Sequence, residues 1–353
     1  MSDKSIYIRP TARLAPTAGL ADAAAGSFGL AVAGRRDLLF AAAELIERDG
    51  SVIGRRIVSA AELRSGQPEL AGLLERLGRR HDPVAGLALD RPLIMGVVNV
   101  TSDSFSDGGR YLAADAAIAH ALQLEAEGAD ILDIGAESTR PGAKPVDLQV
   151  ELSRVMPVIE ALAPQVRAPL SIDTRKAEVM RRAARAGAAL INDVSALTYD
   201  PDAPQVAAET GLPVVLMHAQ GDPRTMQDDP RYEDVVLDVY DWLGARIEAC
   251  ERAGIPRSRL LVDPGIGFGK TLAHNLALLG ASSIFHGLGC AVLLGASRKS
   301  FIGGLTGADA QGRLPGSLAA ALLAAEQGVQ VLRVHDVAAT RQALAVWEAA
   351  RGA

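Results

Sequence analysis

The chain has 353 residues, of which 49% are hydrophobic and 22% are charged, so it can bury the core of one large domain or of two. Its formal net charge of −6 excludes broad nucleic-acid binding, which needs a basic surface to meet phosphates. Its two cysteines, Cys250 and Cys290, form no CxxC pair, which argues against a disulfide framework or a cysteine zinc site. The first residues show no basic segment followed by an apolar one, and no apolar stretch approaches about 20 residues. We therefore expect a cytoplasmic protein without membrane partners.

Residues 1–90 show helical spacing in two stretches. RRDLLFAAAELIERDG covers residues 35–50, and SAAELRSGQPELAGLLERLGRR covers residues 59–80. Their apolar positions predict two amphipathic helices. We expect residues 1–90 to form an extension or small subdomain, which either stands by itself or covers the rest of the fold, and we assign it no chemistry.

From residue 91 to residue 353, short apolar runs alternate with helical stretches. The runs are LIMGVVN, ADILDIG, PLSIDT, ALINDV, PVVLMH, LLVDPGI, AVLLGAS and VLRVHD. Continuous apolar runs of this length are typical of parallel strands covered on both faces. Residues 113–128, 176–187 and 316–328 have helical spacing and end at glycine, a common helix stop. Eight such units predict a (β/α)8 TIM barrel with an N-terminal extension, and a doubly wound open sheet is the main rival.

Each expected strand ends in a polar residue that can do chemistry. These residues are Asn99, Asp133, Asp173, Asn192, His218, Asp263, Ser297 and His335. The active site of such a barrel lies at the carboxyl ends of its strands. The pattern therefore predicts one site assembled from all eight units.

The segment DPGIGFGKT, residues 263–271, contains glycines but fits no nucleotide motif. The first glycine of a phosphate-binding loop would fall on Pro264, and the third position of a dinucleotide motif is Lys270. We therefore expect the glycines to let the backbone pass close to a ligand or turn sharply. Asp263, at the strand end, is the functional candidate.

Basic residues follow the last two strands. Arg298 and Lys299 precede an expected helix start, where backbone N–H groups favour an anion or a polar ring. Arg333 and His335 are two positions apart, so a strand places both side chains on one face. That pair predicts a clamp for phosphate or pyrophosphate.

Two segments that follow the first two strands predict mobile loops. Residues 101–109 and residues 135–143 are rich in hydroxyl groups and glycine. Loops of this composition suit closure over a charged ligand.

These segments resemble the dihydropteroate synthase family. The matching stretches are LIMGVVNVTSDSFSDGG, ADILDIGAESTRPGA, SIDTRKAEV, INDVSAL, VVLMHAQGDPRTMQ, DPGIGFGKT, SRKSFIG and RVHD, in the family's order. The resemblance implies a (β/α)8 barrel and the condensation of p-aminobenzoate with 6-hydroxymethyl-7,8-dihydropterin pyrophosphate in folate biosynthesis. It also implies Mg²⁺ as the cofactor and a homodimer.

The resemblance also implies roles for individual residues. The pterin-binding set is Asp173, Asn192, Met217, Asp263 and Lys299. The pyrophosphate contacts are Asn99, Thr139, Arg333 and His335, with Asn99 also the metal contact. The p-aminobenzoate contacts are Phe105, Thr139, Arg140, Pro141 and Ser300. The residues expected to act in catalysis are Asp107, Lys299, Arg333 and His335.

Two other functions stay open. Folate-dependent methyltransferases share a related pterin-binding barrel, but they have no need for the two loops that serve the second substrate and pyrophosphate. A paralogue that binds pterin without turnover is the other alternative, since fold alone does not fix function. Such a protein would be expected to lose loop residues that this chain retains.

Overall fold

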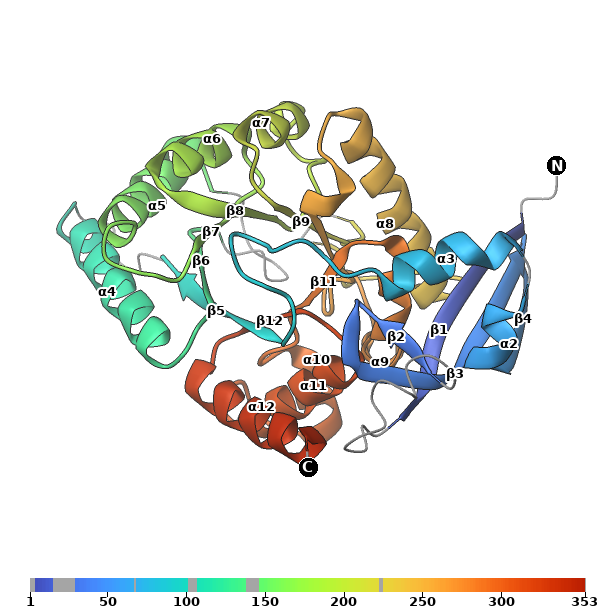
Figure 1. The fold of residues 1–353 in the computed structure, drawn as a ribbon. Helices are drawn as coiled ribbons and strands as arrows, with labels where there is room; N and C mark the ends of the chain where they lie inside the picture. Colours follow the sequence, from blue (N-terminus) through green and yellow to red (C-terminus); the bar gives the residue numbers. More distant parts are fainter. Residues whose placement is uncertain are drawn as a thin grey trace.

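The computed structural model describes residues 4–14, 29–66, 68–100, 107–137, 146–221 and 225–352. Within this part of the chain, eight parallel strands pair in sequence order and close into a barrel (Figure 1). They are β5 (Leu93–Asn99), β6 (Ile131–Gly135), β7 (Leu170–Asp173), β8 (Ala188–Asp193), β9 (Val214–Met217), β10 (Leu260–Asp263), β11 (Ala291–Leu294) and β12 (Val331–Val334). The predicted (β/α)8 barrel is therefore confirmed, because β5 pairs with β12 where an open sheet would have free edges.

Helices cover the outside of the barrel. They are α4 (Asp107–Ala126), α5 (Leu148–Leu162), α6 (Ala177–Ala186), α7 (Ala203–Thr210), α8 (Val235–Arg252), η1 (Arg257–Arg259), α9 (Leu272–Gly280), η2 (Ser282–Leu288), α10 (Ser300–Thr306), α11 (Leu314–Glu326) and α12 (Val337–Gly352). The predicted helix stop at Gly187 is confirmed, since this residue ends α6 with a φ of 114°, a conformation that favours glycine. No helix in the described ranges is both long and apolar enough to cross a membrane.

One helix begins earlier than expected. The helix indicated by the spacing of residues 113–128 is confirmed, and α4 already begins at Asp107. Gly108 and Gly109 therefore lie in the first turn of a helix instead of in a loop. The glycine pair argued for a loop because glycine is unfavourable in helix interiors, but an aspartate at a helix start interacts favourably with the helix dipole.

The barrel is plugged at the amino ends of its strands. Val84 and Leu89 pack with Leu93, Ile131 and other apolar residues of the barrel interior. They belong to the connection from α3 to β5, which crosses this end of the barrel (Figure 1). The polar residues of the fold are thereby left to the carboxyl end.

The amino-terminal extension is mainly a sheet. It contains β1 (Lys4–Leu14), β2 (Leu30–Val32), β3 (Arg35–Asp49), β4 (Val52–Ser59), α2 (Ala60–Arg64) and α3 (Pro68–Gly78). Figure 1 shows it beside α8, on the side of the barrel away from α4 and α5. The second predicted helix appears as two, because the chain bends at Ser65 and Gly66 between α2 and α3.

The helix predicted over residues 35–50 was wrong, because this stretch forms β3. The strand pairs with β1 on one side and with β2 and β4 on the other, so partners on both edges satisfy its backbone. It is also buried on both faces: Ile46 joins the barrel core, whereas Leu45 joins a separate core of the extension. Tertiary pairing here overrides the helix propensity of an alanine-rich segment.

Candidate active site

A buried carboxylate, Asp133, joins three strands inside the barrel. Its Oδ2 accepts hydrogen bonds from Arg333 Nε at 2.6 Å and from Asn192 Nδ2 at 3.0 Å. Arg333 also donates from Nη2 to Asp173 Oδ2 at 2.7 Å. Strands β6, β7, β8 and β12 thus bring four polar side chains together. The sequence placed Asp133 at a strand end but gave it no role.

Part of this cluster has no partner in the described part of the chain. Asp133 Oδ1 and Ser171 Oγ are buried without a hydrogen bond there, and the two residues lie opposite each other on β6 and β7. A buried polar atom without a partner costs free energy. The cluster therefore has hydrogen-bonding capacity that the described residues do not use.

Burial sets the charge of Asp173. Loss of water raises the pKa of its carboxyl to about 7, against the opposing effect of the Arg333 guanidinium and with help from nearby Asp133. Such a carboxyl can hold or release a proton near neutral pH.

Asp263 and Lys299 form a second polar pair near this cluster. Asp263 ends β10 and accepts from the backbone N–H of Gly265 at 2.7 Å, and burial raises its pKa although Lys299 opposes this. Lys299 donates from Nζ to the carbonyl of Ile266 and lies 4.6 Å from the centroid of the Phe268 ring. Burial lowers the pKa of Lys299 to about 8, and Asp263 opposes that shift.

The glycine-rich turn after β10 packs directly against the end of β9. Gly265 has a φ of 69°, and a Cβ there would lie 1.9 Å from the carbonyl oxygen of His218. The sharp turn is therefore confirmed, and the close approach at Gly265 is to the backbone of the chain itself; the expected approach to a ligand stays a prediction. Lys270 joins the same two segments by donating to the carbonyls of His218 and Phe268 at 3.3 and 2.9 Å. Sequence reasoning missed this lysine, since its spacing was tested only against nucleotide motifs.

Lys270 also touches a histidine ring. Its Nζ lies 2.9 Å from His218 Nδ1. Burial lowers the pKa of Lys270 to about 7 and that of His218 to about 3. His218 is therefore neutral at physiological pH.

The two residues of the predicted anion clamp have different partners. Arg333 pairs with carboxylates inside the barrel, whereas His335 Nδ1 lies 3.1 Å from Ser297 Oγ just beyond the strands. Arg298 forms an ion pair with Asp336. Its guanidinium therefore pairs with a carboxylate of the chain itself, although the sequence predicted that it would lie near a bound ligand.

The remaining predicted residues fall into three groups. Asn99 ends β5 with an exposed side chain, and Ser300 begins α10, also exposed. Met217 ends β9 and is buried. Asp107 begins α4, and its side chain is not described. Phe105, Thr139, Arg140 and Pro141 lie outside the described residues.

A buried ionic network follows Asp173 in the chain. Lys176 Nζ contacts Glu137 and Glu151, Thr174 Oγ1 donates to Glu151 at 2.5 Å, and Arg175 pairs with Glu137. Buried charges are tolerated only when paired. The network therefore fixes the base of the loop after β6 to the end of β7. The sequence offered charges here but nothing to say that they would be buried together.

A cleft of about 360 Å³ lies next to this network. It is lined by Arg175, Val194, Ser195, Thr198, Tyr199, Ala219, Gly221, Met226, Trp242 and Phe268. Phe268 also faces Lys299, so the cleft adjoins the polar cluster. A pocket of this size with mixed lining suits a small organic ligand.

Comparison with known proteins gives a consistent result. Residues 95–335 match the family model described as pterin binding enzyme. The dihydropteroate synthase of Escherichia coli strain K12 is 49% identical over 263 residues, which cover 74% of this chain and 93% of the relative. The Bacillus subtilis enzyme of that name is 43% identical over 248 residues, covering 70% and 85%.

Solved structures agree. The Yersinia pestis dihydropteroate synthase with a sulfonamide drug complex has a TM-score of 0.73 and 49% identity, covering 77% of this chain and 100% of that chain. The Xanthomonas albilineans enzyme in complex with 7,8-dihydropteroate has a TM-score of 0.68 and 51% identity, covering 76% and 96%. The chain therefore belongs to the dihydropteroate synthase family of pterin-binding enzymes.

Proposed function

We propose that the cluster at the carboxyl end of the barrel performs the dihydropteroate synthase reaction. In that reaction p-aminobenzoate displaces pyrophosphate from 6-hydroxymethyl-7,8-dihydropterin pyrophosphate. The observation that carries this assignment is the buried polar cluster beside the Phe268 cleft, in which Asp133 Oδ1 and Ser171 Oγ are without partners among the described residues. Related structures of the Xanthomonas albilineans enzyme hold 4-aminobenzoic acid and 7,8-dihydropteroate.

The pterin ring is read by groups on opposite walls of the pocket. Asp173, Asn192 and Asp263 offer oxygen acceptors to ring N–H and amino groups, and Lys299 donates to the ring. Met217 packs on the face of the ring. A ligand without these ring groups would leave buried polar atoms unpaired, which is a strong basis for selectivity.

The pyrophosphate lies toward the outer end of the pocket. His335, Arg333 and Thr139 stabilise its charge, and Asn99 adds an exposed carboxamide oxygen at the end of β5. Mg²⁺ prefers oxygen ligands and often takes few from the protein, with the rest from water and phosphate. Asn99 therefore fits as the protein contact, and Mg²⁺ bound there would neutralise charge on the leaving group.

The p-aminobenzoate binds on the side of the Phe268 cleft. Phe105, Arg140 and Pro141, from the two loops, enclose its ring, and Ser300 presents an exposed hydroxyl beside Lys299. Asp107 supports the pyrophosphate from the start of α4. These roles follow from the family motifs that the residues match.

The chemistry requires placement more than acid–base catalysis. The bond from the pterin CH₂ to the pyrophosphate oxygen breaks with carbocation character, and the aniline nitrogen forms the new C–N bond. The nitrogen lone pair is free at neutral pH, and the proton lost afterwards goes to solvent or pyrophosphate. Proximity and stabilisation of the departing charge supply the rate, without a covalent enzyme intermediate.

A direct assay tests the function. Purified chain with both substrates and Mg²⁺ should release pyrophosphate, and EDTA should suppress the release. No release of pyrophosphate with authentic substrates would refute the assignment and favour a paralogue that only binds pterin. Tight binding of a methylated folate would instead favour a methyltransferase.

We also propose a homodimer through α9, α10 and α11. Leu272 and Leu276 are each 39% exposed, Leu305 is 54% exposed and Leu323 is 53% exposed. Helix α9 contacts both α10 and α11, so these exposed leucines lie on neighbouring helices, and large apolar patches mark interfaces. Light scattering should give twice the chain mass, and Leu323→Asp should halve it. A monomeric parent chain would contradict the proposal.

We also propose that the chain divides into two domains near residue 90. The separate core of the extension, built from residues such as Leu30, Phe40 and Leu77, supports it. Limited proteolysis that cuts between the extension and β5 would test it.

A further inference from the structure

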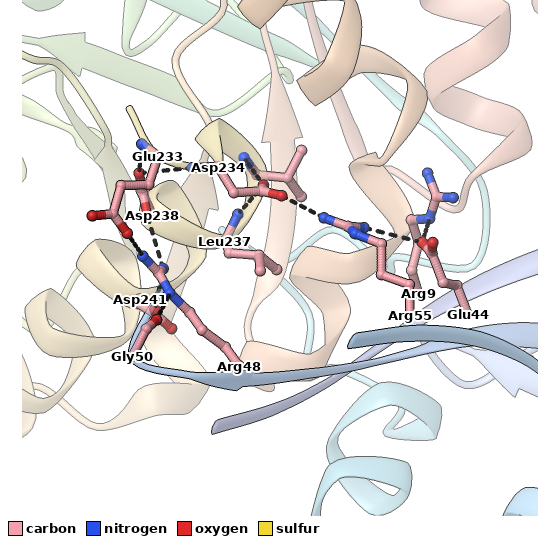
Figure 2. Close-up of polar contacts among 11 residues, drawn as sticks. Arg9, Glu44, Arg48, Gly50, Arg55, Glu233, Asp234, Leu237, Asp238 and Asp241 are labelled. Carbon is pink, nitrogen blue, oxygen red and sulfur yellow. Dashed lines mark hydrogen bonds and ion pairs between the residues drawn. The ribbon is translucent and has the colours of Figure 1, made fainter. Parts of the chain in front are cut away.

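The extension meets the barrel at a cluster of acidic residues around the start of α8. Glu233, Asp234, Asp238 and Asp241 lie along this end of the helix (Figure 2). Acidic side chains are favourable near a helix amino terminus. Four of them so close together also repel one another, and that repulsion needs opposing charge.

The opposing charge comes from the extension. Arg48 of β3 donates from Nη1 to Asp238 Oδ1 and from Nη2 to Glu233 Oε2, both at 2.8 Å, and it lies 3.5 Å from Asp241. Arg55 of β4 forms an ion pair with Asp234, as Figure 2 shows. The side chain of Arg48 is only 17% exposed. Its carboxylate partners are more open, since the side chains of Asp238, Asp241 and Glu233 are 24%, 46% and 68% exposed. The contact therefore depends on one guanidinium shared by three carboxylates, and water weakens each separate pair.

The third strand contributes a neutral contact. Tyr7 of β1 donates its hydroxyl to both oxygens of Asp241 at 2.9 and 2.8 Å. Each of β1, β3 and β4 thus touches the same end of α8. The sheet therefore grips the helix start at several points.

Asp238 links Arg48 to the segment that precedes α8. Its Oδ1 receives Arg48, while its Oδ2 accepts from the backbone N–H of Glu233 at 2.9 Å. The residue before Glu233 is Tyr232, whose hydroxyl donates to the carbonyl of Gly269 at 2.8 Å. The contacts therefore run from the extension to the turn that follows Asp263.

The same connection carries aromatic rings under the site. Trp242 of α8 packs edge-on against the His218 ring with centroids 4.9 Å apart, and the Tyr232 ring lies 6.0 Å from it. His218 directly follows Met217. Movement of the α8 start would therefore shift the strand end that carries the pterin-facing methionine.

We infer that Arg48, with Arg55 and Tyr7, acts as a positioning residue for pterin binding, an assignment that rests on the pterin roles proposed above. The extension holds the β9–α8 connection, and this connection holds Met217 and the turn at residues 265–270 in their binding geometry. The family model begins at residue 95, so these positioning residues lie outside it. Arg48 itself touches no substrate.

The test compares Arg48→Ala with Arg56→Ala in the full chain. Arg56 is a neighbouring β4 arginine whose ion pair, with Glu62, stays inside the extension and is 56% exposed at both ends. We expect Arg48→Ala to raise KM for dihydropterin pyrophosphate about fivefold or more, since small displacements near a site are costly. The kcat should stay within about twofold, as in Arg56→Ala, whereas the KM for p-aminobenzoate should rise as well, because Trp242 and Phe268 line the cleft assigned to that substrate. Arg48→Lys should recover part of the loss because it retains the charge.

A spectroscopic reading separates positioning from general weakening. In a Trp347→Phe background Trp242 is the remaining tryptophan of the chain, so its emission reports the α8 start. Arg48→Ala should change this emission and Arg56→Ala should not. Asp238→Asn should reproduce the Arg48→Ala effects, and the double variant should be no worse than either.

Several results would overturn the positioning role. One is a folded Arg48→Ala with an unchanged pterin KM, and another is a loss of kcat alone. If Arg48→Ala does not fold, Arg48→Lys and Asp238→Asn decide by the same KM and emission criteria. A parent chain that releases no pyrophosphate would refute the proposed function instead, and the Trp242 emission would still report on the contact.

Discussion

Two clusters of charged groups, one inside the barrel and one around the start of α8, differ in whether the chain itself supplies all their partners. Inside the barrel, burial raises the pKa of Asp173 to about 7 and lowers that of Lys299 to about 8, so burial opposes the charged form of each group. At the extension, a hydrogen bond to Asp238 raises the pKa of Arg48 further above its ordinary value. The pocket is therefore incomplete without a ligand, whereas the contact around α8 is complete within the chain.

The largest expected effect lies in the pocket. Lys299→Ala and Asp263→Ala should each weaken pterin binding about 100-fold, because each leaves a buried polar partner unpaired. Calorimetric titration with a pterin measures this, with Arg56→Ala as the control. Unchanged affinity in either variant would show that this residue does not bind the pterin. The cluster inside the barrel would then differ less from the contact around α8.

Removal of the central carboxylate should affect stability as well. Asp133→Ala leaves Arg333 and Asn192 without their shared acceptor, so we expect the free energy of unfolding to fall by about 3 kcal/mol. Urea titration measures it. A loss below about 1 kcal/mol would show that other groups accept the hydrogen bonds of Arg333. The stability of the cluster would then depend less on Asp133 than its contacts indicate.

The contact around α8 should show a smaller coupling. A double-mutant cycle with Arg48→Ala and Asp238→Asn should give an interaction free energy of about 1 kcal/mol in unfolding. Additive losses in the two single variants would mean that the two residues act independently. The contact would then not be the matched pair that its geometry shows.

A dependence of stability on pH is also expected, on the order of 2 to 3 kcal/mol between pH 5 and pH 7.5. The folded-state pKa of Asp173 is raised from 3.8 to about 7, so its contribution to stability is present below pH 3.8 and is lost as pH rises toward 7. Urea titrations at pH 5 and pH 7.5 should show a smaller pH difference for Asp173→Asn than for the parent chain. An equal difference would mean that Asp173 is already charged in the fold.

The sequence predicted the barrel well because parallel strands leave a simple trace. Each runs through continuous apolar residues and stops at a polar one, as β5 and β10 do. The segment that became β3 had no such trace, since alanine and leucine suit a helix equally and its longest pairing is with β1, which is distant in the chain. Nonlocal pairing of this kind is invisible to local periodicity.

The site was predicted by residue type more than by contact. Asp173, Asn192, Asp263 and Lys299 were named from motifs, and β7, β8, β10 and the segment after β11 carry them. The central position of Asp133 and the contacts of Lys270 depend on which strands face each other, which no spacing reveals. Arg333 and His335 share one strand direction but have different partners, because β6 and β7 supply carboxylates to Arg333 while Ser297, in the segment after β11, contacts His335.

Closure of the barrel by β5 and β12 imposes an order on synthesis. The strands of the extension are made first and can pair early, while β5 waits for the last strand of the barrel before both its edges are covered. The face of the sheet that bears Tyr7 and Ile46 must wait for α8. A growing chain therefore exposes apolar surface and strand edges for most of its translation, which makes the nascent protein a natural client for chaperones.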